Sequence, residues 1–244
     1  TEEALIHITR ELYRVHKNKN LVISGGVALN CVANGRILRD TDFERVWVPP
    51  VASDTGVCFG SALYHWHNTL RNKREFELTH AFYGKDYSDA EIVSALDAAG
   101  LKYERMEDDA LLKRVAKDLS EQKIVGWFQG RAEIGPRALG NRSILSSATS
   151  NAMKDLINAR IKHREPFRPF APVVLIERLN EFFEYEHPDP FMTVAPKIRP
   201  DKIALIPAAA HVDGTGRIQT IDRKANPRYY GVIEEYAKLT GIPV

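Results

Sequence analysis

The sequence has little cysteine and no long hydrophobic run, and each absence narrows the class of protein. Cys31 and Cys58 are the only cysteines among 244 residues, and they do not form a CxxC motif. Both lie on apolar faces of predicted helices, which indicates buried free thiols in a reducing compartment. No apolar run approaches the roughly 18 residues that a membrane-spanning helix needs, and no signal-peptide pattern is recognisable. The sequence therefore predicts a cytoplasmic protein without a membrane partner.

Motifs that mark several common reactions are absent as well. The sequence contains no GxxxxGKS/T phosphate loop, no GxSxG nucleophile elbow and no HExxH zinc motif. The nearest match to a GxGxxG dinucleotide motif begins at Gly214 and fails at its last position. The eight histidines provide no close chelating pair, and neither cysteine has activating neighbours. The roles that these absences leave open are the binding and positioning of an anion. Such roles suit chemistry at a phosphate or a phosphate-activated acyl group.

The composition is that of an ordinary globular protein, with 44% hydrophobic and 27% charged residues. A net charge of +2 gives no general reason to expect nucleic acid as a partner. The charge is uneven, however. The segment from Gln129 to Phe170 contains eight basic and three acidic residues, a local surplus of five positive charges. Such a surplus favours a small anionic ligand over a polyanion.

The segment Gln129–Ser143, which we call the arginine loop, follows an apolar run typical of a buried strand. Its three arginines, Arg131, Arg137 and Arg142, each lie close to a glycine. Glycine lets a backbone approach a ligand closely, and arginine offers a planar fork of donors to phosphate or carboxylate oxygens. A surface loop with solvated arginines is the alternative for any one of them. Three in one loop favour an anion site.

Four further clusters carry polar side chains that could bind a ligand. The turn Ser24–Asn30 places two glycines before a predicted helix, which suits a phosphate or an empty strand–helix turn equally. Asp54 stands at the start of a predicted helix. It is interpreted either as the N-cap of that helix or as an oxygen ligand of a metal. Lys162–Pro172 interleaves basic residues with phenylalanine and proline, and predicts a rigid basic wall. His211–Thr220 is either a polar hairpin turn or part of the site, with Arg217 and Gln219 on one strand face.

The chain alternates between helical and strand patterns. We expect helices at 2–16, 27–38 and 56–70 with strands at 21–23 and 46–48, which argues for helices on a largely parallel sheet. The second half predicts helices at 88–99, 109–121, 151–161 and 227–239. Its predicted strands lie around Tyr103 and at 124–128, 143–147, 173–176, 191–198 and 217–221. This part is α+β with a mixed sheet.

Five segments together resemble the O-carbamoyltransferases, which include nodulation-factor carbamoyltransferases and enzymes of antibiotic biosynthesis. The likeness runs nearly from end to end of the chain. It rests on SGGVALNC from Ser24, WVPP from Trp47 with DTG from Asp54, GRAEIGPRALGNRSIL from Gly130, REPFRPFAP from Arg164 and HVDGTGRIQT from His211.

The resemblance implies an α/β protein of two domains. Residues 1–74 resemble the last part of an actin-like ATPase (Kae1-like) carbamoyl-transfer domain, and 75–87 form a linker. Residues 88–244 resemble a YrdC-like α+β domain with a twisted mixed sheet, and the family's pattern continues beyond the last residue. Such YrdC-like domains make carbamoyl-adenylate from carbamoyl phosphate and ATP with Mg²⁺. The Kae1-like domain, with an iron-type metal, passes the carbamoyl group to a sugar hydroxyl, as on a lipochitooligosaccharide nodulation factor.

The resemblance also assigns residues. In the transfer domain it implies that Gly25, Gly26 and Asn30 touch the nucleotide, and that Asp54 is a metal ligand. The implied catalytic residues of the second domain are Arg131, Arg137, Arg142 and His211. The implied substrate- and nucleotide-binding residues are Asn141, Ser143, Lys162, Arg164, Arg168 and Arg217.

The sequence departs from the family in its metal ligands, and two alternative functions need to be weighed. The family's metal-binding histidines are missing from this sequence, so we expect no tight metal binding and no complete transfer to sugar by this chain alone. A homodimer is a further expectation. The alternative function is a YrdC-like module that binds RNA or a nucleotide through a basic concave face, although the near-neutral charge makes nucleic acid the weaker hypothesis. A sugar kinase of the actin-like superfamily finds no phosphate-transfer aspartate here.

Overall fold

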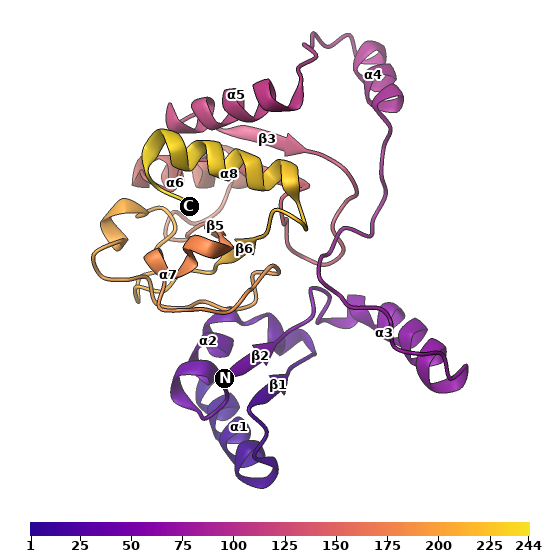
Figure 1. Cartoon of the computed structure of the whole chain (residues 1–244). Helices are drawn as coiled ribbons and strands as arrows, with labels where there is room; N and C mark the ends of the chain where they lie inside the picture. Colours follow the sequence, from indigo (N-terminus) through magenta and orange to yellow (C-terminus); the bar gives the residue numbers. More distant parts are fainter.

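The computed structural model describes residues 1–244 and begins with two helices packed on a pair of parallel strands (Figure 1). The elements are α1 (Glu2–His16), β1 (Asn20–Val22), α2 (Cys31–Asp40) and β2 (Arg45–Trp47). β1 and β2 pair in parallel, with Leu21 opposite Val46. Ile6, Leu21, Ile37 and Phe43 form the small core between them. The predicted helix–strand alternation and parallel pairing are confirmed.

The chain between β1 and α2 differs from the predicted continuous helix. A short 3-10 turn, η1 (Gly26–Leu29), comes first, and α2 starts only at Cys31. The reason is a capping side chain: Asn30 Oδ1 accepts a hydrogen bond from the backbone N–H of Ala33 at 3.1 Å. Asparagine is among the preferred N-cap residues because its side chain satisfies a helix N–H that has no intrahelical partner.

The third helix stands apart from this core. A 3-10 turn, η2 (Asp54–Gly56), leads into α3 (Val57–Tyr64), which continues as a π-helical turn, η3 (His65–Thr69). Figure 1 shows α3 projecting away from the body of the molecule. No residue of α3 is buried. The expectation that Cys58 is a buried thiol is therefore wrong: it is exposed, whereas Cys31 is buried as predicted.

The segment after α3 has no helix or strand as far as α4 (Asp89–Ala98), which begins at the predicted capping box of Ser88 and Glu91. The predicted linker region is nonetheless packed. Ala81 is only 1% exposed, and its carbonyl accepts a hydrogen bond from the N–H of Ile134 at 2.8 Å. This stretch therefore lies along the arginine loop before the chain leaves for the isolated α4 (Figure 1).

The larger body holds two further strand pairs. β3 (Val125–Phe128) and β4 (Arg142–Leu145) are antiparallel, and β5 (Val173–Leu175) and β6 (Gln219–Ile221) are parallel. The predicted mixed sheet is not present as one sheet, because the antiparallel pair and the parallel pair are separate two-stranded sheets. The remaining elements are the helices α5 (Asp108–Ser120), α6 (Asn151–Ile157), α7 (Leu179–Phe182) and α8 (Pro227–Thr240), and the short turns η4 (Asn158–Lys162), η5 (Ile176–Arg178) and η6 (Ile203–Leu205).

Two predicted strands are absent. The stretch around Tyr103 is irregular and exposed, because no strand lies beside it to satisfy its backbone. Residues 191–198 form no ladder and make only isolated bridges near Ile198. Here the buried carboxylate of Asp189 accepts hydrogen bonds from the N–H groups of Thr193 and Val194 at 2.7 and 2.8 Å. These N–H groups are therefore taken up locally and are not available to a neighbouring strand.

The core of the larger body lies between α5, α8 and the β3–β4 hairpin. Val115 and Leu119 from α5 pack with Trp127 from β3 and with Tyr229 and Val232 from α8. α8 has the predicted Pro227 in its first turn and the predicted Gly241 at its end, where φ is 77°. None of the helices is long and apolar enough to cross a membrane.

Direct hydrogen bonds join the two parts of the chain. The Nδ2 of the buried Asn34 on α2 donates to the carbonyl of Thr193 at 2.8 Å, and the N–H of Ala195 donates to the carbonyl of Cys31 at 3.0 Å. A Cβ on Gly35 would lie 2.7 Å from the carbonyl oxygen of Ala195. α2 thus packs closely on the segment that follows Asp189.

Candidate anion-binding site

The glycines of the arginine loop allow close approach to the rest of the protein. Gly135 has a φ of 96°, and a Cβ there would lie 2.2 Å from the carbonyl oxygen of Pro50. Gly140 has a φ of 107°, and a Cβ there would lie 2.1 Å from the ring of Tyr229. The interpretation that these two glycines make room for a ligand is therefore wrong. They let the loop pack against the N-terminal part and against α8.

Two of the three predicted arginines hold the loop in place. Arg142 donates from Nη1 to the carbonyls of Gln129 and Asn141 at 2.6 and 2.8 Å, and its guanidinium lies 3.6 Å from the ring centroid of Phe128. Arg131 donates to the carbonyls of Gly84 and Tyr83 at 3.0 and 3.2 Å. Neither side chain lines the cavity between the β3–β4 hairpin, the Lys162–Pro172 segment and β6.

An acidic residue that the sequence reasoning missed organises the same loop. One carboxylate oxygen of Glu133, Oε1, accepts hydrogen bonds from three backbone N–H groups, those of Leu139, Asn141 and Arg142, at 2.8, 2.8 and 3.1 Å. This carboxylate stabilises the conformation of the loop strongly, because hydrogen bonds to a charged acceptor are stronger than those between neutral groups. The only signal in the sequence was an acidic residue alone within a basic loop.

The base of the loop is a buried network of amides. Gln129 Nε2 lies within hydrogen-bonding distance of the carbonyl of Gly140 and of the Oδ1 atoms of Asn141 and Asn226, at 2.8, 3.1 and 2.9 Å. The indole N–H of Trp127 donates to the same carbonyl at 2.9 Å. Asn141 is only 5% exposed. The structure thus places this predicted substrate-binding residue inside the network, away from the cavity.

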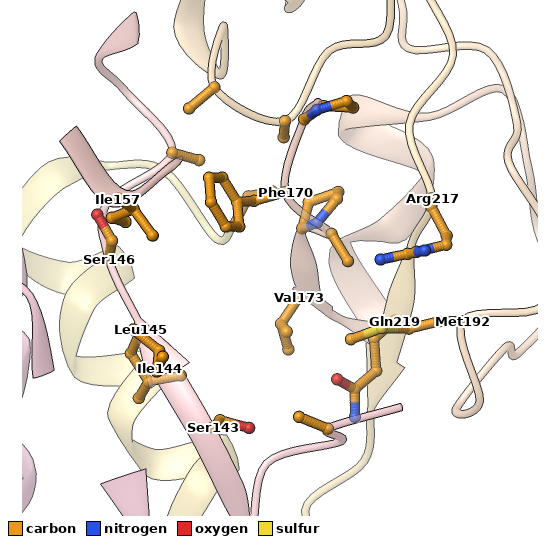
Figure 2. A pocket seen from close by; sticks show the side chains of 18 of the residues that line it. Ser143, Ile144, Leu145, Ser146, Ile157, Phe170, Val173, Met192, Arg217 and Gln219 are labelled. Carbon is orange, nitrogen blue, oxygen red and sulfur yellow. The ribbon is translucent and has the colours of Figure 1, made fainter. Parts of the chain in front are cut away.

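A cavity of about 350 Å³ lies between the β3–β4 hairpin, the Lys162–Pro172 segment and β6 (Figure 2). Five predicted site residues meet there although they come from distant parts of the sequence. The cavity also has a large apolar lining, including Val173, Met192 and Phe170. The predicted residues that line it are Arg137, Ser143, Lys162, Arg164 and Arg217.

The charged residues that line this cavity are all basic. Lys154 joins the four predicted basic residues on its wall, and the lining contains no aspartate or glutamate. None of these five basic side chains forms a salt bridge; by contrast, Arg168, which lies outside the lining, pairs with Glu165 at 3.0 Å. Cations gathered without a counter-ion repel one another, and a bound anion would relieve that repulsion.

The three cavity arginines are held to different degrees. Arg164 Nε donates to Asn158 Oδ1 at 2.7 Å, and its guanidinium lies 4.8 Å from the ring centroid of Phe170. Arg137 donates to the carbonyl of Leu29 at 3.3 Å, which links the cavity to the η1 turn. Arg217 makes no hydrogen bond, and its Nε is buried without a partner. Burial, and then the neighbouring charge of Arg137, lower the pKa of Arg217 below the usual arginine value.

Gln219, also in the cavity wall, was noticed in the sequence only as a neighbour of Arg217 on one strand face. It is 4% exposed, and its Nε2 donates to the carbonyl of Leu139 at 2.8 Å. Its Oε1 is buried and has no hydrogen-bond partner. Buried side-chain acceptors are normally paired, so an unpaired one in a cavity wall indicates a partner supplied from outside the protein.

The remaining predicted residues lie elsewhere. His211 hydrogen-bonds to Thr215 Oγ1 at 2.8 Å, and burial, with the nearby charge of Arg217, lowers the pKa of its imidazole. Asn30 serves as the N-cap of α2. Gly25 and Gly26 form the turn before it, where a Cβ on either would meet open space. None of these four residues lines the cavity.

Asp54 does not stand in a metal site built by this chain. It is the first residue of the turn η2 and is exposed, and the N-cap position belongs to Ser53. No group of three or more histidine, cysteine, aspartate or glutamate side chains is placed to hold a metal ion. A single exposed carboxylate does not supply the coordination that iron-type ions take in proteins. The residues present therefore do not fit such a metal.

Fold and cavity together define an α/β protein with a cavity whose charged lining residues are all basic. Comparison with known families matches residues 1–63 to the model described as "Carbamoyltransferase N-terminus" and residues 116–244 to "Carbamoyltransferase C-terminus". The chain belongs to the carbamoyltransferase family, which confirms the resemblance seen in the motifs.

Three curated relatives illustrate the similarity. The nodulation protein NolNO of Sinorhizobium fredii is 40% identical over all of this chain and 36% of its own length. The nodulation protein NolO of Bradyrhizobium diazoefficiens is 38% identical over all of this chain and 46% of its own length. An uncharacterized protein of Synechocystis is 37% identical over 98% of this chain and 43% of its own length. The chain thus spans less than half the length of these relatives.

Proposed function

We propose that this chain is the part of an O-carbamoyltransferase that binds carbamoyl phosphate and ATP and forms carbamoyl-adenylate. One observation carries the proposal: the cavity collects five basic side chains, and no acidic residue lines it. Arginine forks match the oxygens of phosphate groups, and a volume of about 350 Å³ lies in the range of small-molecule sites. Membership of the carbamoyltransferase family supports a carbamoyl group as the acyl group. The basic side chains of the cavity supply positive charge for the phosphate to which that group is attached.

The domain assignment belongs to the same proposal. Residues 88–244 would be the YrdC-like adenylate-forming domain, 75–87 a connecting segment, and 1–74 the last part of the actin-like transfer domain. The two family matches, which fall on either side of this segment, support that division. Arg137 donates to a carbonyl of η1, so the nucleotide site and the transfer domain would be in direct contact.

The geometry suggests different roles for the basic residues. Arg137, Arg164 and Arg217 would bind phosphate oxygens and stabilise the negative charge that develops during transfer. Lys162 would add a mobile point charge at the rim, because its side chain is exposed and lines the cavity. Arg131 and Arg142 would act indirectly by holding the loop, since their donors are occupied by backbone carbonyls.

The reaction balances as follows. ATP, carbamoyl phosphate and one water give carbamoyl-adenylate, pyrophosphate and inorganic phosphate, with Mg²⁺ accompanying ATP. The carbamoyl group then passes to an acceptor hydroxyl, and AMP leaves. We propose a carbohydrate hydroxyl as acceptor because the relatives include proteins named for nodulation. In the full-length protein Asp54 would be one ligand of the transfer-domain metal, with the other ligands coming from residues outside this chain.

ATP–pyrophosphate exchange that depends on carbamoyl phosphate tests the proposal in the full-length protein. Arg137→Met should lower this exchange by 10-fold or more, because a charge-assisted hydrogen bond contributes roughly 1.5–3 kcal/mol. The matched control is Arg168→Met, which changes an arginine of the same segment that lies outside the cavity, and it should exchange like the wild type. Wild-type exchange that is indifferent to carbamoyl phosphate would refute adenylate formation.

The RNA-binding alternative has a different signature. A binding module would hold single-stranded RNA with an affinity that falls steeply with salt concentration, because phosphate contacts release counter-ions. It would show no exchange. Electrophoretic mobility shifts at 50 and 200 mM salt, run beside the exchange assay, separate the two functions.

A further inference from the structure

Two neighbouring residues of the cavity wall each keep one buried polar atom without a partner. They are the Nε of Arg217, a donor, and the Oε1 of Gln219, an acceptor. Gln219 is the first residue of β6, and Arg217 lies two residues before it, outside the strand. Figure 2 shows both side chains at the same wall of the cavity. An unmade buried hydrogen bond costs on the order of 1–3 kcal/mol, so a fold that keeps two of them in one cavity indicates a ligand that satisfies both.

The orientation of the Gln219 amide follows from its other contact. Its nitrogen donates to the carbonyl of Leu139 at 2.8 Å, so the oxygen must lie on the opposite side. Figure 2 shows that oxygen on the same side as Val173, with the guanidinium group of Arg217 beside it in the same wall, and both unpaired atoms are buried. The side chain of Met192 lies beside them and covers this wall. Methionine is flexible, so its rotation would uncover both atoms.

The chemistry of these atoms limits what can bind there. A carbonyl-type oxygen accepts hydrogen bonds and repels phosphate oxygens, so Gln219 needs an N–H donor. Arg217 needs an acceptor beside it. A carbamoyl group, O=C–NH₂, presents one acceptor and one donor in a plane and matches the pair. The amino edge of adenine also offers a donor and an acceptor. A neutral ring, however, gains little electrostatic attraction beside Arg137 and Arg217, whereas the negatively charged acyl phosphate is attracted by both.

We propose that Gln219, together with Arg217, recognises the carbamoyl group and makes the site selective for carbamoyl phosphate over other acyl phosphates. The Oε1 of Gln219 accepts from the carbamoyl NH₂, and the Nε–H of Arg217 donates to the carbamoyl oxygen. The phosphate then lies beside Arg137, Arg164 and the terminal Nη groups of Arg217, whose Nε alone is used by the carbamoyl oxygen. This inference rests on the proposed function, because it names the feature of the substrate that the site reads.

Acetyl phosphate is the appropriate probe, since it replaces the NH₂ by a methyl group of similar size. Isothermal titration of the full-length protein with carbamoyl phosphate, acetyl phosphate and inorganic phosphate measures the selectivity. The wild type should prefer carbamoyl phosphate by roughly 10-fold to 100-fold, the range expected when a buried acceptor is left unpaired by the analogue. Gln219→Met, which keeps the size and removes the acceptor together with the amide donor to Leu139, should abolish the preference. Binding of inorganic phosphate by the same variant shows whether loss of the Leu139 contact disturbs the anion site.

Gln122→Met is the matched control. Gln122 also has a buried oxygen without a partner, but it does not line the cavity, so its replacement should leave the selectivity intact. Thermal melts identify any loss of folding. If Gln219→Met does not fold, a crystal structure of the wild type with carbamoyl phosphate decides, because the carbamoyl nitrogen must lie about 2.7–3.2 Å from Oε1.

The outcomes separate this inference from the proposed function. A wild type that binds carbamoyl and acetyl phosphate equally, or a Gln219→Met variant that keeps the preference, overturns the inference alone. A wild type that binds neither acyl phosphate overturns the proposed function and the inference with it. A Gln219→Met variant that changes only the preference for ATP over GTP shows that the amide reads adenine, and this also overturns the inference.

Discussion

Arg217 should destabilise the ligand-free protein, and this expectation can be worked out from its surroundings. Its Nε is buried without a partner, it forms no salt bridge, and Arg137 and Arg164 contribute like charges close to it. An unsatisfied buried donor costs on the order of 1–3 kcal/mol. Arg217→Met keeps most of the side chain's apolar volume and removes the charge and the donor. We therefore expect the free energy of unfolding to rise by about 1–2 kcal/mol.

Thermal denaturation measures this directly. For a chain of this length, each kcal/mol shifts the melting temperature by about 2–4 °C, so Arg217→Met should melt about 2–8 °C above the wild type. Inorganic phosphate should raise the melting temperature of the wild type, because a ligand of the folded state stabilises it by mass action. In the variant this phosphate effect should weaken, with a Kd roughly 10-fold to 150-fold higher from the loss of about 1.5–3 kcal/mol.

Arg168→Met provides the control for this experiment. Arg168 forms an exposed ion pair with Glu165, with both side chains 54% exposed, and such pairs contribute about 0–1 kcal/mol. Its melting temperature and phosphate response should stay close to those of the wild type. A lower melting temperature for Arg217→Met, or an unchanged phosphate response, would show that Arg217 is structural and would contradict an anion site built at the expense of stability.

Three further predictions concern the frame of the site. Gly140→Ala should cost about 3 kcal/mol or more in thermal melts, because φ is 107° and the added Cβ would lie 2.1 Å from an aromatic ring; Gly60→Ala, where a Cβ meets open space, should be neutral or stabilising. Glu133→Ala should cost about 3–5 kcal/mol in urea denaturation because three backbone N–H groups lose one acceptor; a loss below about 1 kcal/mol would mean that water replaces the carboxylate. Iodoacetamide at pH 8 should label the exposed Cys58 within minutes and leave Cys31 unlabelled, because burial raises the pKa of the Cys31 thiol. Mass spectrometry measures the labelling. Equal labelling of both cysteines would mean that α2 opens readily.

Several features of the fold were readable locally. Helix ends at Ser88 and Gly241 follow from capping chemistry within a few residues of chain, and the structure has them where the sequence predicted. The strand at 191–198 was not readable. The apolar pattern there favours a strand, but the side chain of Asp189 takes the backbone N–H groups first. Competition by a side-chain acceptor for backbone N–H groups cannot be seen in the alternation of apolar and polar residues along the sequence.

The candidate site divides in the same way. Residue type and local charge pointed to an anion, and Arg137 in the loop, Arg164 in the basic wall and Arg217 in the last polar cluster do meet in one cavity. The sequence could not separate Arg137 from Arg142, because both sit beside glycine and both present the same fork of donors. Only the tertiary structure shows that Arg142 donates to backbone carbonyls and holds the loop, whereas Arg217 has a buried donor without a protein partner.

By itself the sequence determined the family, the helix–strand order of most of the chain and the sign of the charge in the site. These depend on residue identities and on interactions between near neighbours, which a linear chain records. The tertiary structure decided that the loop glycines serve packing, that Glu133 anchors the loop, and that Gln219 keeps an acceptor free in the cavity wall. Each of these depends on which groups from distant segments fill the space around a side chain, and residue order alone does not specify that.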